Sequence, residues 1–267
     1  MRLPLYGYTF RRQATSFVIL FLERDGSTYL TSLLGRHPEI TATFERFASM
    51  RQAGQGAQEQ LAWARSFLMP PLVGRSKAIG FKTKLVDVMD PDGFRELLQS
   101  LDCRILHMGR RNHIKASISR INARRLHAAI GQWNLDSEED RLPPILVDKA
   151  ELDPLLMDRQ VKEAELDAYV RQLGLPTLRL YYEDLLRDRE SALNQVFSFL
   201  RVRPLSLDGR PIKNTSDDLR EAIVNFHALR AAYRGTRYEP MFDERVEVPG
   251  RRPGNPPTIS NNPPEVR

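Results

Sequence analysis

The sequence predicts a three-layer α/β protein in which helices flank a central parallel sheet on both faces. Short buried runs of β-branched and aromatic residues alternate along the chain with helical patterns of ten or more residues. Connections of that length join parallel neighbours, and a parallel sheet is usually covered on both faces. No repeat and no interior linker divides the pattern, so one domain is expected over residues 1–248. The Pro-rich tail, residues 249–267, is expected to be extended or disordered.

Four segments are predicted as buried strands because they are short and rich in β-branched or aromatic residues. They are residues 17–22, 79–84, 103–108 and 177–181. The predicted helices lie between and after these strands, and two are opened by an Asp cap followed by Pro in the first turn. The first helix follows the turn at residues 24–28, and the second follows Asp90-Pro91. The other four are predicted over residues 112–127, 153–173, 191–200 and 215–235. Residues 48–76 and 127–150 show the least pattern and are expected to be loops.

The composition is that of a globular protein without membrane segments. Hydrophobic residues make up 41% and charged residues 28% of the 267 residues, which argues against a chain disordered throughout. The longest apolar run, residues 17–22, is far short of the roughly 20 residues that span a bilayer. No signal-peptide pattern is present, and the single cysteine, Cys103, excludes an internal disulfide and a thiolate metal site. A cytoplasmic location is therefore expected.

The chain is basic, with a formal net charge of +6 and a pI of about 9.6. A basic balance favours anionic partners, although an Arg-rich composition can equally follow from codon usage. The arginines are scattered, with no run of five like charges, which favours discrete anion sites over a nucleic-acid-binding tail. A small anionic molecule is expected as a partner, and nucleic acid is not. The sequence is equally compatible with a monomer and with a homodimer.

The most informative segment, residues 17–34, predicts a buried strand, a tight turn and a helix. The turn reads Arg24-Asp25-Gly26-Ser27-Thr28. Gly26 lets the backbone approach a ligand closely, and the first N–H groups of the helix carry the positive end of its dipole. Such a turn can bind phosphate or sulfate. The Walker A and dinucleotide-binding patterns are both absent, which counts against an ordinary ATP- or GTP-hydrolysing P-loop protein.

This turn, continued by Tyr29-Leu30 and His37-Pro38-Glu39-Ile40, resembles the phosphosulfate loop of the sulfotransferases that use 3′-phosphoadenosine 5′-phosphosulfate (PAPS). Three further elements of that family follow in its order. They are Arg111 with Ser119, eight residues apart; Tyr182-Glu183-Asp184-Leu185 after a strand; and Lys213-Asn214-Thr215-Ser216 before the last helix. The four elements span about residues 15–230 and resemble the bacterial and carbohydrate-acting members. The resemblance implies the P-loop-like α/β fold of that family.

The resemblance also implies which residues bind the donor nucleotide. They are Arg24, Asp25, Gly26, Ser27, Thr28 and Tyr29 for the 5′-phosphosulfate, Arg111, Ser119 and Lys213 for the 3′-phosphate, and Tyr182 for the adenine. Most contacts in the first group would come from backbone N–H groups of the turn.

Two positions leave the assignment open. The family usually has Ser at the position of Asp25, and a carboxylate there would repel the donor unless it points away or pairs with Arg24. Arg110 duplicates Arg111, and only the eight-residue spacing to Ser119 chooses between them.

Two catalytic residues follow from the same resemblance. Lys82, at the end of a predicted strand where open α/β sheets bind ligands, would stabilise the leaving oxygen. Many members that act on phenols and steroids have a His base two residues later, but that position is Lys84 here. Glu45 is therefore the candidate base, and Glu39 is a less favoured substitute. Burial against neighbouring Phe residues would raise the pKa of Glu45, whereas Arg46 would lower it. For both candidates the alternative is a solvated surface residue.

The predicted reaction is the in-line transfer of a sulfuryl group from PAPS to a hydroxyl, which releases adenosine 3′,5′-bisphosphate (PAP). A Glu base favours an alcohol, such as a sugar or a small natural product, over an acidic phenol. No metal is expected to take part, since the histidines lack metal-ligand spacing, and His107 is expected in the core. The alternatives are a nucleotide or small-molecule kinase with a degenerate P-loop, a non-catalytic PAP-binding homologue and a nucleic-acid-binding module.

Overall fold

A five-stranded parallel sheet forms the centre of the fold. The computed structural model describes residues 14–69, 76–135, 140–207 and 215–246. The strands are β1 (Thr15–Leu20), β2 (Ile40–Thr43), β3 (Ala78–Thr83), β4 (Arg104–Gly109) and β5 (Thr177–Tyr181). Their order is β2-β3-β1-β4-β5, and every neighbouring pair is parallel. The predicted α/β class with a parallel sheet is confirmed, and the four predicted strands are all present.

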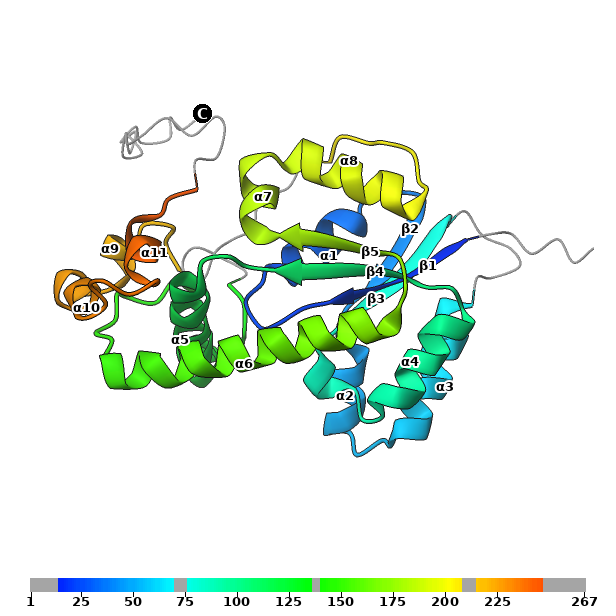
Figure 1. Ribbon diagram of the computed structural model, residues 1–267, viewed down its shortest axis with the longest axis horizontal. Helices are drawn as coiled ribbons and strands as arrows, with labels where there is room; N and C mark the ends of the chain where they lie inside the picture. Colours follow the sequence, from blue (N-terminus) through cyan, green and yellow to red (C-terminus); the bar gives the residue numbers. More distant parts are fainter. Residues whose placement is uncertain (1–13, 70–75, 136–139, 208–214, 247–267) are drawn as a thin grey trace, which may run out of the picture.

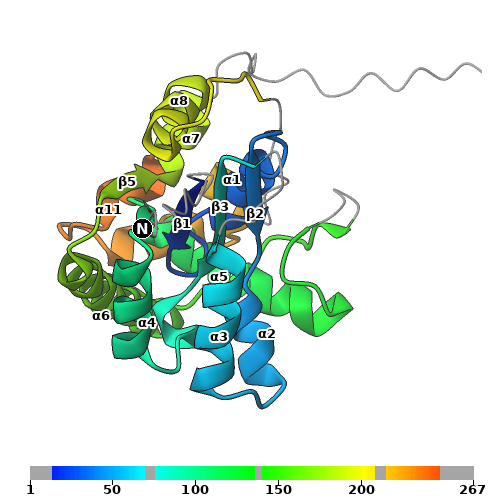
Figure 2. The same cartoon turned by 90° about the vertical axis from the view of Figure 1, so that its right-hand side faces the viewer.

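Helices cover both faces of this sheet. The α-helices of the described residues are α1 (Ser27–Leu34), α2 (Arg46–Gln52), α3 (Ala57–Leu68), α4 (Pro91–Ser100), α5 (His113–Ile130), α6 (Lys149–Leu173), α7 (Tyr182–Arg187), α8 (Arg189–Leu200), α9 (Leu219–Ala222), α10 (Phe226–Ala232) and α11 (Glu239–Asp243). Figure 1 and Figure 2 show α7 and α8 above the sheet and α3, α4 and α6 below it. The three predicted layers are therefore present.

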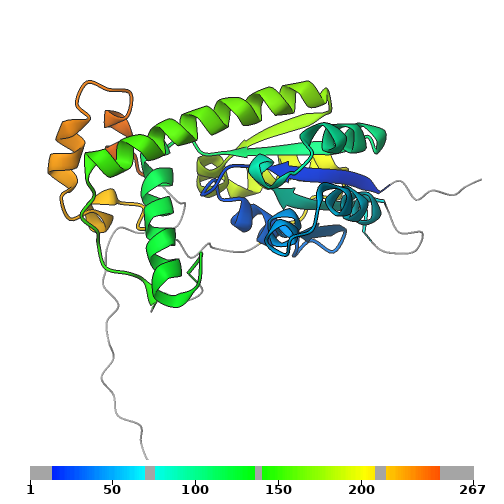
Figure 3. The ribbon, with the colours of Figure 1, turned by 90° about the horizontal axis from the view of Figure 1, so that it is seen from below.

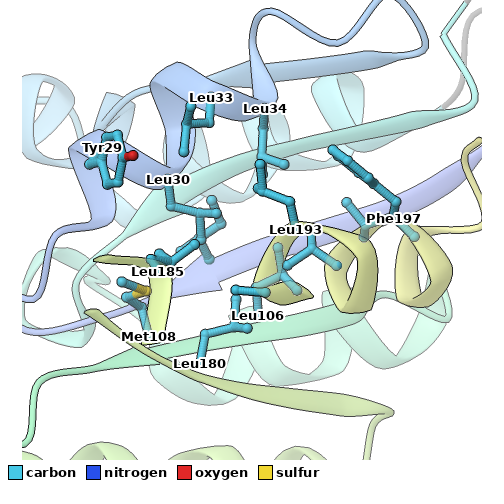
Figure 4. Close-up of a cluster of buried hydrophobic side chains, with 14 of the residues drawn as sticks. Tyr29, Leu30, Leu33, Leu34, Leu106, Met108, Leu180, Leu185, Leu193 and Phe197 are labelled. Atoms are coloured by element: carbon cyan, nitrogen blue, oxygen red, sulfur yellow. The ribbon is translucent and has the colours of Figure 1, made fainter. Parts of the chain in front are cut away.

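The alternation of side chains along β1 explains how one strand supports both layers. Phe17 and Ile19 pack into the apolar cluster formed with α1, α7 and α8. Val18 and Leu20 pack into the cluster on the opposite face, with α2, α3, α4 and α6. All four side chains are fully buried, as expected for a central parallel strand. Figure 4 shows the first cluster, where leucines of α1 meet Phe197 of α8.

The carboxyl ends of the strands meet at one edge of the sheet. In Figure 1 and Figure 3 this edge faces α5 and the C-terminal helices α9 to α11, and α6 runs along the sheet and past it. A third apolar cluster joins α5, the first half of α6 and the C-terminal helices. Ligands of open α/β sheets bind outside the carboxyl ends of the strands, so this edge is where a site is expected.

Residues 48–76 were expected to be a loop, and that expectation is wrong. The described part of this stretch contains most of α2 and all of α3. The buried Gln60 of α3 donates to the carbonyls of Phe47 (3.2 Å) and Asp87 (3.0 Å), so contacts distant in sequence hold these helices in place. Strand β2 was also not predicted, because of its four residues only Ile40 is buried.

The predicted helix starts at Asp153 and Thr215 are also wrong. Helix α6 begins at Lys149, because the side chain of Asp148 accepts from the N–H of Ala150 at 3.0 Å and caps it. Pro154 therefore lies inside the helix rather than in its first turn.

The single helix predicted over residues 215–235 is broken into α9 and α10. Ile223 forms a parallel bridge with Ile145, which takes its backbone out of the helical hydrogen-bond pattern. Just after the bridge, the side chain of Asn225 pairs with both the N–H and the carbonyl of Val147. Asp218, not Thr215, caps the first of the two helices.

Lys213 and the tail, residues 249–267, lie outside the described residues, so the domain boundary at residue 248 stays a prediction. Within the described ranges, none of the helices combines the length and the hydrophobicity needed to cross a bilayer.

Candidate active site

A cleft of about 950 Å³ opens at the carboxyl edge of the sheet. It is lined by the turn after β1, by the start of α1 and by residues that follow β3, β4 and β5. Its charged lining residues are Arg24, Arg36, Lys84, Arg110, Lys115, Arg120 and Arg124 against Glu23, Glu45 and Asp217. The excess of basic groups makes the cleft attractive to an anion, as the predicted discrete anion site requires.

The turn between β1 and α1 forms one end of this cleft. Gly26 is in the left-handed conformation (φ 81°) and immediately precedes the helix. The N–H groups of the first helical turn have no intrahelical acceptor, and two hydroxyls, of Ser27 and Thr28, lie beside them. Gly26, Ser27, Thr28 and Tyr29 all line the cleft. The predicted phosphate or sulfate cradle therefore faces the cleft.

Gly26 also has no room for a side chain. A Cβ atom there would lie 2.2 Å from Cδ2 of Tyr182, whose ring packs directly on the glycine. We expect Gly26→Ala to lower the free energy of unfolding by more than the roughly 1–3 kcal/mol typical of a strained backbone conformation. Gly54→Ala is the matched control, because Gly54 has a similar φ of 72° and open space around it. Equal losses in urea unfolding for the two variants would contradict the close packing on Tyr182.

Asp25 does not face the cleft. Its side chain is 1% exposed and accepts from the N–H of Leu22 at 3.0 Å. It forms an ion pair with Arg159 of α6, rather than with Arg24. Burial raises the pKa of Asp25, and the ion pair with Arg159 opposes that shift. The carboxylate therefore points away from the cleft and would not repel an anionic ligand there. The other arrangement considered, a pair with Arg24, is not present.

Lys82, near the carboxyl end of β3, does not itself line the cleft but is buried against two residues that do, Thr28 and Glu45. Its side chain is 2% exposed, and Nζ is 2.8 Å from Oγ1 of Thr28 and 3.1 Å from Oε1 of Glu45. The ammonium also lies 5.2 Å from the ring centre of Phe21, a cation–π distance. Burial lowers the pKa of Lys82, and the carboxylate of Glu45 opposes that shift. The structure thus brings the two candidate catalytic residues into direct contact beside the cradle.

Glu45 is held between two lysines. Its Oε1 contacts Lys82, and Oε2 lies 3.3 Å from Nζ of Lys84. Burial raises the pKa of Glu45, but the two ammonium groups outweigh it, and the pKa lies below the usual glutamate value. The sequence indicated Arg46 as the charge that would lower this pKa, whereas Lys82 of β3 and Lys84 of the loop after it supply that effect. Phe44 is 50% exposed and offers little shielding.

The two adjacent arginines after β4 have different environments. Arg110 lines the cleft, donates to the carbonyl of Arg24 at 3.1 Å and lies over the ring of Tyr182. Arg111 is exposed and forms a two-armed ion pair with Asp184 at 2.7 and 2.8 Å. The structure therefore brings Arg110, and not Arg111, to the cleft wall that holds Ser119.

Ser119 lies near Arg24 as well as near the end of β4. Its Oγ is 3.0 Å from Nε of Arg24 and accepts a hydrogen bond from it. Burial and the nearby charge of Arg110 lower the pKa of Arg24 to about 10. Two guanidinium groups and a hydroxyl, contributed by the turn after β1, the turn after β4 and α5, therefore share one region of the cleft.

The Tyr182-Glu183-Asp184 segment builds the turn that presents Arg110. The Tyr182 ring packs on Gly26, and burial raises its pKa to about 12, so it stays neutral. The buried carboxylate of Glu183 accepts from the N–H groups of Arg111 and Asn112, both at 3.1 Å. Tyr182 thus lines the cleft as predicted, while the acidic residues that follow it have a structural role.

Lys115 also lines the cleft, although it was not among the residues predicted from the sequence. It is 4% exposed and lies one helical turn before Ser119, on the same face of α5. Its Nζ is 3.4 Å from Oδ1 of Asp217. The four-residue spacing to Ser119 was the signal that could have revealed it. Lys213, the remaining predicted ligand, lies outside the described residues.

The histidines do not contribute to the cleft. His107 is buried on β4 beside Arg179 and Asp167, and burial together with Arg179 lowers its pKa to about 4. It is a core residue, as the sequence suggested. His113 pairs with Glu163 at 3.1 Å. Among the described residues, no group of three or more His, Cys, Asp and Glu side chains could hold a metal ion.

Comparisons with known proteins give the chain a distant relative. No family model matches it. Nodulation protein H of Rhizobium meliloti strain 1021 is 25% identical over 246 residues, which cover 85% of this chain and 94% of the relative. The chain is a distant homologue of nodulation protein H. A second Rhizobium meliloti sequence of the same name is 25% identical over 245 residues, with the same coverage.

Among solved structures, mouse sulfotransferase SULT7A1 complexed with PAP is similar, with 14% identity and a TM-score of 0.40. The match covers 81% of this chain and 67% of that chain. This structural agreement is loose.

Proposed function

We propose that this protein transfers a sulfuryl group from PAPS to a hydroxyl of a saccharide or another small-molecule acceptor. The observation that supports this most is a single basic cleft in which an anion cradle, a Lys–Glu pair and a second cluster of cationic groups meet. A donor with phosphate groups at both ends needs two such anion sites. The distant homology noted above and the absence of a Walker A lysine are consistent with the proposal.

The residues present fit such a donor. The cradle of Gly26, Ser27 and Thr28 would hold the 5′-phosphosulfate, and the guanidinium of Arg24, which donates to Ser119, would lie between this cradle and the 3′-phosphate. The buried Nε of Arg110 has no hydrogen-bond partner within the described part of the chain, so it can serve a ligand. Such a donor set of N–H groups, guanidinium groups and hydroxyls suits phosphate and sulfate oxygens.

The second anion site would bind the 3′-phosphate. We assign it to Arg110, Lys115 and Ser119, which line the same cleft, with Tyr182 against the adenine. Arg111 retains the family spacing to Ser119 but is engaged by Asp184. The two arginines are therefore the natural pair of variants for a test.

The chemistry is assigned to the Lys82–Glu45 pair. The donor would supply an activated sulfuryl group. Glu45, at the cleft wall, would accept the proton of the acceptor hydroxyl. Lys82, in contact with the start of α1, would stabilise the negative charge on the leaving oxygen. The proposal keeps an alcohol as the acceptor, because a glutamate base replaces the His of the phenol-acting members. A cytoplasmic location is part of the same proposal.

Ligand-induced thermal stabilisation tests the nucleotide directly. We expect PAP at about 100 times its Kd to stabilise the protein by about 2.7 kcal/mol. For a chain of this size that free energy corresponds to a rise in Tm of roughly 5–10 °C. Arg110→Ala should remove most of this rise, since a hydrogen bond to a charged group contributes about 1.5–3 kcal/mol. Arg111→Ala is the matched control and should retain it.

Three other outcomes separate the alternatives. Equal or larger stabilisation by ATP with magnesium would favour the kinase with a degenerate P-loop. Stabilisation by PAP without any turnover of PAPS would indicate a non-catalytic PAP-binding homologue. Loss of binding in Arg111→Ala, with Arg110→Ala unaffected, would return the 3′-phosphate to the arginine selected by the eight-residue spacing.

A further inference from the structure

Arg159 joins the two anion-binding segments from a third element of the fold. It lies on α6, is 6% exposed, and does not line the cleft. One amino group, Nη1, donates to the carbonyl of Glu23 at 3.2 Å. The other, Nη2, pairs with the carboxylate of Asp25 and lies 3.4 Å from the carbonyl of Arg110. One planar guanidinium therefore contacts the turn after β1 and the turn after β4.

These two turns carry the opposite ends of the proposed nucleotide site. Asp25 directly precedes Gly26 of the cradle, and the carbonyl of Arg110 belongs to the residue assigned to the 3′-phosphate. The turns also contact each other, through Arg110 and the carbonyl of Arg24. That contact comes from a side chain that a ligand would engage, whereas Arg159 lies behind the site and stays available to hold the turns together.

We propose that Arg159 is a positioning residue that fixes the spacing between the two anion sites and thereby sets the preference for a nucleotide with phosphates at both ends. The inference rests on the proposed function, because it assumes that both sites serve one ligand. A ligand binds more tightly through two linked sites than through one only when the spacing of the sites lets it reach both. A change in that spacing therefore weakens a bisphosphate more than a monophosphate.

The ion pair between Asp25 and Arg159 also explains how an acidic residue is tolerated beside an anion cradle. A buried carboxylate is costly unless it is paired and hydrogen-bonded, and Asp25 has both Arg159 and the N–H of Leu22. The pairing keeps the negative charge directed towards α6. In this chain, the residue that departs from the family pattern thus supplies one half of the link between the turns.

The test compares three ligands by calorimetry: PAP, 5′-AMP and 3′-AMP. In Arg159→Met we expect the Kd of PAP to rise at least tenfold, while the Kd of each monophosphate changes less than threefold. Arg171→Met is the matched control, because Arg171 is an exposed arginine near the other end of α6. It should leave all three values unchanged. Arg159→Lys can pair with Asp25, but its ammonium lacks the two amino groups with which the guanidinium contacts both turns. It should therefore lose an intermediate share of the affinity for PAP.

In Arg159→Met, Asp25 would remain buried without its ion-pair partner, and the protein could fail to fold for that reason. A second variant covers this case. Asp25→Ser/Arg159→Met removes both charges, which is far less costly than removing one. It should fold and show the same loss of preference for PAP over the monophosphates.

The outcomes distinguish this inference from the proposed function. If the wild-type protein binds PAP no better than 5′-AMP, the proposed function fails, and the inference fails with it. If the wild type prefers PAP and the variants keep that preference, only the inference is overturned. Equal losses for all three ligands would likewise overturn it, because they would indicate a purely structural role for Arg159.

Discussion

Replacing Lys82 by Met is expected to lower kcat by on the order of 10²–10³-fold, the usual effect of losing one preorganised donor to a developing negative charge. Lys82 is buried, and its ammonium already lies 2.8 Å from the hydroxyl of Thr28 in the proposed cradle. The ammonium also lies 3.5 Å from Oγ of Ser27, so it contacts both hydroxyls at the start of α1. The measurement is PAP release from PAPS with a panel of mono- and oligosaccharides.

Lys77→Met is the control for the Lys82 variant. Lys77 precedes the same strand but is 57% exposed and pairs with Glu39 at 2.6 Å, away from the cleft. It should retain wild-type turnover. The affinity of Lys82→Met for PAP should fall much less than kcat, because the role assigned to the ammonium is in the transition state. A variant that keeps its turnover would remove Lys82 from the mechanism.

Replacing Glu45 by Gln is expected to lower kcat by roughly 10²–10⁴-fold, the range for the loss of a general base. Nucleotide binding should be retained, because the introduced amide would keep the shape of the side chain while the cradle and Arg110 stay in place. Glu39→Gln tests the rival base. Glu39 pairs with Lys77 and accepts from the N–H of Arg203, so it is committed elsewhere. Loss of turnover in Glu39→Gln, with Glu45→Gln active, would reassign the base.

The pH dependence of kcat/KM gives a second check on Glu45 and Lys82. A base acts when ionised, and the lysines hold the pKa of Glu45 below the ordinary glutamate value of about 4.3. The rate should therefore fall on the acid side only below that value. Lys82 acts when protonated, and burial lowers its pKa below the ordinary lysine value of about 10.4. The basic limb should begin below that value and disappear in Lys82→Met.

Much of the fold could be predicted because it depends on local pattern. The run Phe17–Leu22 is apolar throughout, which marks a strand buried on both faces, and Asp90 with Pro91 marks the start of α4. The break between α9 and α10 could not be predicted in this way. It depends on the bridge between Ile145 and Ile223, residues far apart in the sequence.

In the candidate site, too, some features follow from local sequence pattern and others depend on contacts between distant segments. The turn after β1 and the Lys82–Glu45 pair could be found from motif and strand position, and the structure places them in contact. The choice between Arg110 and Arg111 could not, because it is decided by Asp184, which pairs with one of them. Residues such as Arg159 carry no local signal, since their contacts come from segments distant in sequence.

A single ammonium group does not neutralise a glutamate and a leaving oxygen at the same time. Lys82 now neutralises Glu45 at 3.1 Å, which leaves that carboxylate a weak proton acceptor. An incoming phosphosulfate would compete for Lys82, and Glu45, which still lies 3.3 Å from Lys84, would regain part of the proton affinity that its burial favours. In the proposed enzyme, an alcohol that arrives first therefore stays protonated, and its activation waits for the sulfuryl donor.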